Sequence, residues 1–134
     1  MKPLVTFGDP EELAGGYLAG LGIATTVGTS FPTSTLATGV KHLQVELEAG
    51  GVADYPVTER AQVRVTCHMG PNQRGAVKDL ASLAQGHLTR FASDEVSGVV
   101  PLIGRSDVIT DPATKNLMVW FVVRVDLKAT LLAS

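Results

Sequence analysis

Residues 117–128 show the clearest pattern of apolar and polar positions in the chain. Their odd positions are apolar throughout, from Leu117 to Leu127. Alternate residues of a strand point to opposite faces, so this pattern predicts a strand with one face buried along its whole length. The even positions are apolar in the first half and charged in the second: Met118, Trp120 and Val122, then Arg124, Asp126 and Lys128.

The apolar half of that second face needs a cover. A neighbouring subunit and a helix of the same chain are the two alternatives, and we weigh them equally. The charged half is predicted to face water.

Alternation also predicts strands at residues 40–48 and 60–69, and a short strand at 23–29. The two longer segments are separated by a Gly-rich link, which is typical of an antiparallel hairpin. Residues 96–104 form an apolar run interrupted by Pro101. Proline cannot donate a ladder hydrogen bond, so this run is predicted to be an edge or bulged strand.

Two helices are predicted. Asp9 and Pro10 are a typical cap and first residue of a helix that ends near Gly22. Gly15 and Gly16 weaken it, which indicates close backbone contact or a marginal element. The second helix follows the break at residues 70–72 and runs to about Phe91, with an apolar stripe on one face.

The order of these elements favours an α+β fold. We expect one domain over residues 1–134, with a mainly antiparallel sheet of four to five strands and both helices packed on one face. The alternation of helices and strands that a doubly wound fold needs is not present.

The composition excludes several classes of protein. Hydrophobic residues make up 45% of the 134 residues and charged residues 18%, which argues for a packed core. A net charge of -2 argues against a nucleic-acid-binding protein. No apolar run is long enough for a membrane span, so we expect no membrane partner. The single cysteine, Cys67, fits synthesis in a reducing compartment.

No residue pattern indicates catalysis or a cofactor. Cys67 and His68 are neighbours on a strand, so their side chains are predicted to point to opposite faces, with Cys67 buried. His42, His68 and His87 lack metal-ligand spacing and are expected to be solvated or to face a partner. We therefore predict no catalytic, cofactor-binding or metal-binding residue, and no enzyme.

The remaining signal is an interface. Pro101 marks a predicted sheet edge, and free edges pair with other chains unless they are blocked. The polar loop at residues 105–116 mixes charges that would suit salt bridges between subunits. The predicted interface residues are Pro101, Arg105, Asp107, Asp111, Lys115, Met118, Trp120 and Val122.

The sequence resembles the tail terminator, or tail-completion, proteins of long-tailed bacteriophages of actinobacteria. Four pieces carry the resemblance: VTFGDPEELAGGYL near the start, ERAQVRVTCHM, the predicted helix after it, and ITDPATKNLMVWFVVRVDLK near the end. They occur in the family's order and cover most of the chain. Residues 22–40 depart from the family, because many relatives have an arginine- and proline-rich stretch where only uncharged residues stand here.

The resemblance implies a structural virion protein, made in the host cytoplasm, that forms a ring at the head-proximal end of the tail, with six subunits as the expected number. Such a ring stops polymerisation of the tail tube and offers the surface on which the head docks. The implied partners are further copies of the chain, the tail-tube protein and a head-closure or connector protein. DNA would pass through the lumen without specific binding.

Two other classes of protein remain open. One is a head-closure or other connector ring, which differs from a terminator in the neighbours that it touches. The other is a small cytoplasmic ligand-binding or regulatory module, for which the sparse aromatic residues, at 5%, give little support.

Overall fold

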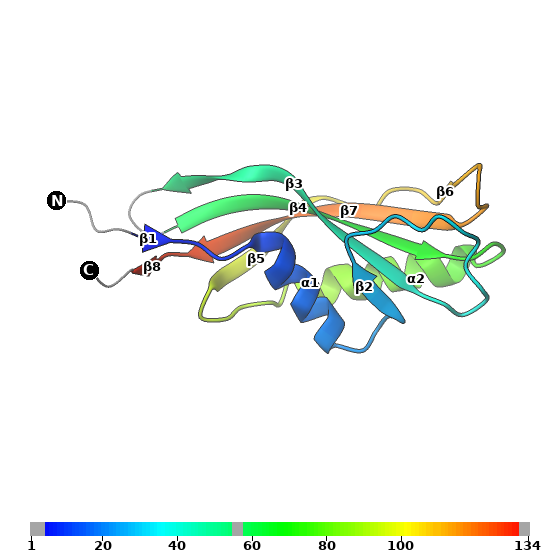
Figure 1. Ribbon diagram of the computed structural model, residues 1–134, viewed down its shortest axis with the longest axis horizontal. Coiled ribbons are helices and arrows are strands. Elements are labelled where there is room, and N and C mark those ends of the chain that lie inside the picture. Colours follow the sequence, from blue (N-terminus) through cyan, green and yellow to red (C-terminus); the bar gives the residue numbers. More distant parts are fainter. Residues whose placement is uncertain (1–4, 55–57, 132–134) are drawn as a thin grey trace.

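The computed structural model describes residues 5–54 and 58–131 and contains two helices on a long, twisted sheet. In Figure 1, strands β3, β4 and β7 run along the molecule and both helices lie below them. The elements, in chain order, are β1 (Val5–Thr6), α1 (Pro10–Gly20), β2 (Thr26–Gly28), β3 (His42–Asp54), β4 (Thr58–Met69), α2 (Arg74–Leu88), β5 (Val96–Ile103), β6 (Ile109–Thr110), β7 (Leu117–Lys128) and β8 (Thr130–Leu131).

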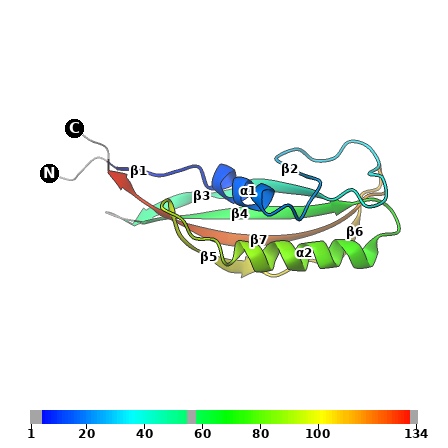
Figure 2. The same ribbon diagram turned by 90° about the horizontal axis from the view of Figure 1, so that it is seen from below.

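The main sheet has six strands, one more than the largest number predicted. Its order is β2-β3-β4-β7-β5, and β6 also pairs with β7. The predicted hairpin of β3 and β4 is confirmed, and all pairings except that of β2 are antiparallel. The short strand β2 runs parallel to β3, so the sheet is mixed. Separately, β1 pairs with β8 near the two ends of the chain (Figure 2).

The core lies between the helices and the face of the sheet that carries the odd positions of β7. Both helices contribute to this single cluster, so the predicted α+β fold with two helices on one face is confirmed. Fully buried members come from every layer: Ala14 and Leu18 of α1, Val77, Ala81 and Leu88 of α2, and Leu43, Val65, Cys67 and Phe121 of the sheet. None of the described helices is long and apolar enough to cross a membrane.

The start of α1 follows from its first residues. Asp9 is the N-cap, and its carboxylate accepts hydrogen bonds from the backbone amides of Glu11 and Glu12 at 3.0 and 3.4 Å. Pro10, which lacks an amide hydrogen, begins the helix without losing a bond. The chain leaves the helix through Gly22, whose φ of +69° favours glycine.

The segment between β2 and β3 forms a strap, residues 29–39, on the sheet face that carries no helix. In Figure 1 it crosses from β2 toward β6 and returns to the start of β3. Phe31 meets the ring of His68 edge-on at 5.0 Å between centroids. Asn116 accepts a hydrogen bond from the amide of Leu36 at 2.8 Å and donates to the carbonyl of Ser34 at 2.9 Å.

Gly70 lies directly beneath the strap, and its replacement is expected to displace it. A Cβ at this position would overlap the carbonyl oxygen of Leu36. Because a backbone atom cannot move aside cheaply, we expect Gly70→Ala to lower the free energy of unfolding by about 1–3 kcal/mol. Gly86→Ala in α2 is the matched control, since a Cβ there meets nothing within 4 Å and should stabilise the helix slightly. Urea denaturation measures the free energy of unfolding of both variants. Equal values for Gly70→Ala and Gly86→Ala would contradict the described position of the strap.

Candidate functional site

Strand β5 carries three exposed aliphatic residues close together at one edge of the main sheet. The strand ends the sheet, so its far side has no partner strand among the described residues. Val100, Leu102 and Ile103 are 39%, 44% and 48% exposed, unusual values for three aliphatic residues within one strand. We call residues 100–103 the apolar edge.

Pro101 lies within the apolar edge, and its prediction as a marker of an edge strand is confirmed. It stands opposite Val123 of β7 and is exposed. The register of β5 shifts between Pro101 and Ile103, so the pairing with β7 is irregular there. Because proline removes one donor, the apolar edge is better suited to side-chain contacts than to a continuous added strand.

No described helix covers the second face of β7, so of the two predicted alternatives the helix is wrong and the neighbouring subunit stays a prediction. Both helices lie on the opposite face, and the guanidinium of Arg64 lies 4.3 Å from the centroid of the Trp120 ring. Glu48 holds this guanidinium through two bonds of 2.9 Å. Met118 and Trp120 remain half-buried, whereas Val122 is fully buried within the subunit.

The charged half of the second face of β7 contains an ion pair between two residues of that strand. Arg124 donates two hydrogen bonds to the carboxylate of Asp126, at 2.8 and 3.0 Å. The alternation predicted that this half faces water: Lys128 is exposed, and Arg124 and Asp126 are half-buried at the surface. Half-exposed pairs of this kind contribute little to stability.

The charged residues of the 105–116 loop lie apart from one another. Arg105 donates to Gln85 of α2 at 3.0 Å, and Asp107 is exposed. The Thr114 hydroxyl donates to Asp111 at 2.6 Å and lowers the pKa of this carboxyl. Lys115 is exposed at a φ of +64°. Within the described residues none of the four forms an ion pair, so salt bridges between subunits stay a prediction.

His68 corrects the expectation that each histidine is solvated or faces a partner. Its side chain is buried beneath Phe31, and its Nε2 donates to Oε1 of Gln44 at 2.8 Å. Burial, and secondarily the nearby His42, lowers the pKa of His68 to about 4, while Asp111 acts in the opposite direction. Alternation identified the correct face of β4, but it could not show that the strap covers that face.

Cys67 lies in the core on the other side of β4, as predicted. Burial raises the pKa of its thiol to about 12, so a thiolate nucleophile is disfavoured there. Cys67 and His68 point to opposite faces of the sheet and cannot act together on one substrate.

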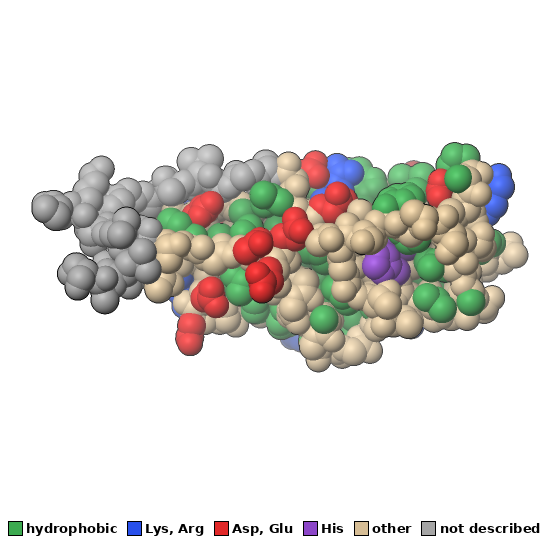
Figure 3. Space-filling view, viewed as in Figure 1, with side chains coloured by type: hydrophobic (Ala, Val, Ile, Leu, Met, Phe, Trp, Pro, Cys, Tyr) green, Lys and Arg blue, Asp and Glu red, His purple; other side chains and the backbone are tan. Residues whose placement is uncertain are grey.

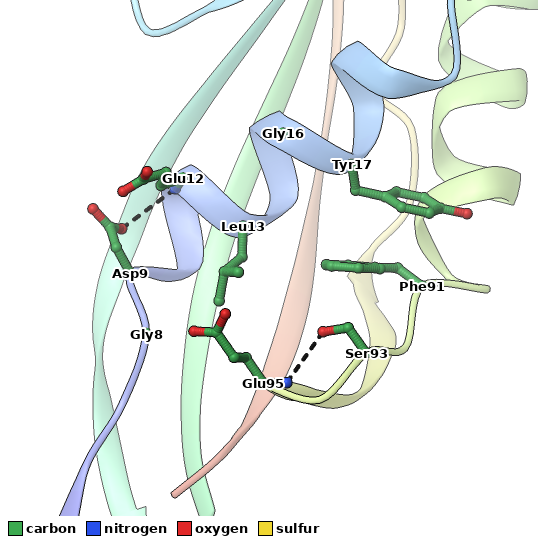
Figure 4. Close-up of a pocket in the computed structure, with 9 residues that line it drawn as sticks. All are labelled: Gly8, Asp9, Glu12, Leu13, Gly16, Tyr17, Phe91, Ser93 and Glu95. Atoms are coloured by element: carbon green, nitrogen blue, oxygen red, sulfur yellow. Dashed lines mark hydrogen bonds between the residues drawn. The ribbon is translucent and has the colours of Figure 1, made fainter. Parts of the chain in front are cut away.

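A surface hollow with a volume of about 660 Å³ lies at the start of α1. Figure 4 shows Tyr17 and Phe91 stacked on one side of it, with their ring centroids 4.3 Å apart. Glu12 and Glu95 line the hollow too, while Asp9 is engaged in capping the helix. No three histidine, cysteine or acidic side chains of the described chain gather closely enough to hold a metal ion.

A second groove lies on the other side of α1, between that helix and β2. It has a volume of about 370 Å³, and its lining is mostly apolar. Sequence analysis missed it, because the three residues that leave it open are glycines of two separate elements. It is lined by Asp9, Glu11, Glu12, Gly15, Gly16 and Ala19 of α1 and its cap, and by Val27, Gly28, Thr29 and Val45.

The fold also occurs in a virus-like particle. A chain from a structure described as the virion of a native gene transfer agent (GTA) particle superposes on this chain with a TM-score of 0.57. The two chains are 15% identical, and the match covers 83% of this chain and 84% of that chain. The sequence matches no protein-family model and no curated protein. The similarity at this level of identity shows that the two chains share a fold.

Proposed function

We propose that this chain is a structural protein of a phage-like virion that assembles with copies of itself. The observation that carries the proposal is the apolar edge, since three exposed aliphatic residues on an unpaired strand are typical of a surface that another chain covers. The fold shared with a chain of the gene transfer agent virion supports a place in such a particle.

The finer proposal is a tail terminator. The chain would form a ring of six subunits that caps the tail tube, stops its growth and offers a docking surface to a head-closure or connector protein. The resemblance of four sequence pieces to that family supports this role. The protein would act through contacts and not through catalysis, with the lumen of the ring giving passage to DNA.

Replacing Leu102 with aspartate tests self-assembly at the apolar edge. Leu102 is exposed in the single subunit, so Leu102→Asp should leave the fold intact. Burying a leucine contributes about 1.5–3 kcal/mol, so its loss should weaken association at least about tenfold. Light scattering coupled to size-exclusion chromatography measures the change, with and without tail-tube protein.

Leu83→Asp provides the matched control. Leu83 lies on the outer side of α2 and is 46% exposed, close to the value for Leu102. We expect this variant to assemble like the wild type. Equal assembly of the wild type and both variants would refute a role for the apolar edge. A wild type that assembles only with a connector protein would favour a connector ring over a terminator.

A further inference from the structure

Three glycines leave the groove between α1 and β2 open, although packing within the described subunit does not require them. Gly15, Gly16 and Gly28 line it, and a Cβ added at any of them would meet nothing within 4 Å. Packing inside the subunit therefore does not require glycine at these positions. Glycine in a helix interior costs about 0.5–1 kcal/mol relative to alanine, so the open groove is kept at some cost in stability.

We propose that this groove receives the apolar edge of a neighbouring copy of the same chain. The inference rests on the proposed self-assembly and names the second surface of that contact. Leu102 and its neighbours would insert between α1 and β2, over Val45 at the floor of the groove. The contact would join two different surfaces, which is the head-to-tail arrangement that a closed ring requires.

The position of the two surfaces supports the proposal. The apolar edge belongs to β5, the last strand on one side of the sheet, whereas β2 is the last strand on the other side. Figure 2 shows the two strands on either side of the long central strands. Each copy can therefore offer its apolar edge to one neighbour while its groove receives the other neighbour.

Charge makes the two surfaces complementary. Asp9, Glu11 and Glu12 line the groove, and Figure 3 shows acidic side chains gathered around the start of α1. Asp9 caps the helix and Glu11 accepts a hydrogen bond from the Leu47 amide at 2.9 Å, so Glu12 is the carboxylate best placed to meet an incoming cation. Between residues 96 and 105 the single charged side chain is that of Arg105, two positions beyond the apolar edge. An inserted edge would bring this cation toward the acidic rim.

The size of the groove also fits aliphatic side chains. Its volume of about 370 Å³ is more than twice the ~150 Å³ of an apolar cavity that accommodates a benzene molecule. A single leucine would not fill it, whereas several residues of the apolar edge would.

Disulfide trapping between two variants tests the pairing of these surfaces. Leu102→Cys and Ala19→Cys are purified separately, mixed and oxidised, and the products are identified by intact mass spectrometry. We expect the mixed disulfide to exceed either homodimer by at least about tenfold, because the contact raises the effective concentration of the two thiols. Cys67 should not interfere, since it is buried and its thiol pKa is about 12.

A mixture of Leu83→Cys and Ala19→Cys is the matched control, and its mixed disulfide should show no such excess. If Leu102→Cys instead links to itself, or its mixture matches the control, the groove is not the acceptor. Leu102→Asp would still weaken assembly in that case, so the proposed self-association would survive. If Leu102→Asp also has no effect, both proposals fail.

Charge exchange gives an independent test. Arg105→Glu and Glu12→Arg should each weaken assembly a few-fold, because exposed pairs contribute ~0–1 kcal/mol. The double variant restores opposite charges across every contact of the ring and should recover assembly. If the double variant loses as much association as the two single variants lose together, the two charges do not meet, and the predicted contact between them is wrong.

Discussion

Lowering the pH from about 6.5 to 4 is expected to remove roughly 3 kcal/mol of stability through His68 alone. The pKa of this histidine is lowered to about 4 in the folded chain, against 6.5 for the unperturbed side chain. Between these values the unfolded chain binds a proton that the folded chain does not, so stability falls as the pH falls. Above pH 6.5 the contribution of His68 should be constant.

The measurement is urea denaturation at a series of pH values, compared with that of His68→Gln. Glutamine can keep a hydrogen bond to Gln44 but has no proton to gain, so its curve should be flatter between pH 6.5 and 4. Carboxylates titrate similarly in both proteins, and the difference between the curves isolates His68. Parallel curves for the two proteins would show that His68 is not buried as described.

Asn116→Ala is expected to cost about 3 kcal/mol and to release the strap. Asn116 is buried, and its amide group pairs with the amide of Leu36 and the carbonyl of Ser34. Each buried group that loses its partner costs about 1–3 kcal/mol, and alanine replaces neither bond. Hydrogen exchange of the Leu36 amide reports the release, and denaturation measures the free energy.

Asn116→Asp is the matched variant for this position. Its carboxylate can still accept from Leu36 but cannot donate to Ser34, so the Leu36 amide should stay protected while stability falls. If alanine and aspartate leave the strap equally protected, Asn116 does not hold it. The strap would then be fixed by other contacts, such as the bond of 2.8 Å from the Thr35 hydroxyl to the carbonyl of Thr114.

Local patterns predicted the long strands and the helices well. The bounds of β7 match the prediction, because its alternation runs without interruption over residues 117–128. Pro101 identified the edge strand through a chemical property of proline itself. Strand β3 continues to Asp54, beyond the predicted end, because register shifts carry it through the Gly-rich segment that suggested a turn. The turn was predicted over residues 50–56; its part up to residue 54 is strand instead, and residues 55 and 56 lie outside the described residues.

Features that depend on contacts between distant residues could not be predicted. The strap is uncharged and looks like a plain connection, yet its anchors Asn116 and His68 lie far along the chain. The parallel pairing of β2 with β3 could not be predicted from local sequence patterns. It depends on the path of the strap, which connects the two strands. Gly15 and Gly16 suggested a close backbone contact or a marginal element, and the structure contradicts the first of these, because both glycines line open space.

The same distinction between local patterns and distant contacts applies to the candidate interface. Sequence alone identified the edge at Pro101, since an apolar run and a proline are both local. It could not distinguish Val122, which the subunit buries, from Met118 and Trp120, which stay partly exposed. The interface role of Met118 and Trp120, and of the charged loop residues, stays a prediction that the assembly experiments test.

The mass of the wild-type particle in solution tests the central proposal most directly. Light scattering coupled to size-exclusion chromatography of the purified chain, alone and mixed with tail-tube protein, would count the copies of the 14.0 kDa subunit. We expect a closed particle of about six copies in at least one of the two conditions. A protein that stays monomeric in both conditions at high concentration would contradict the proposal of a ring.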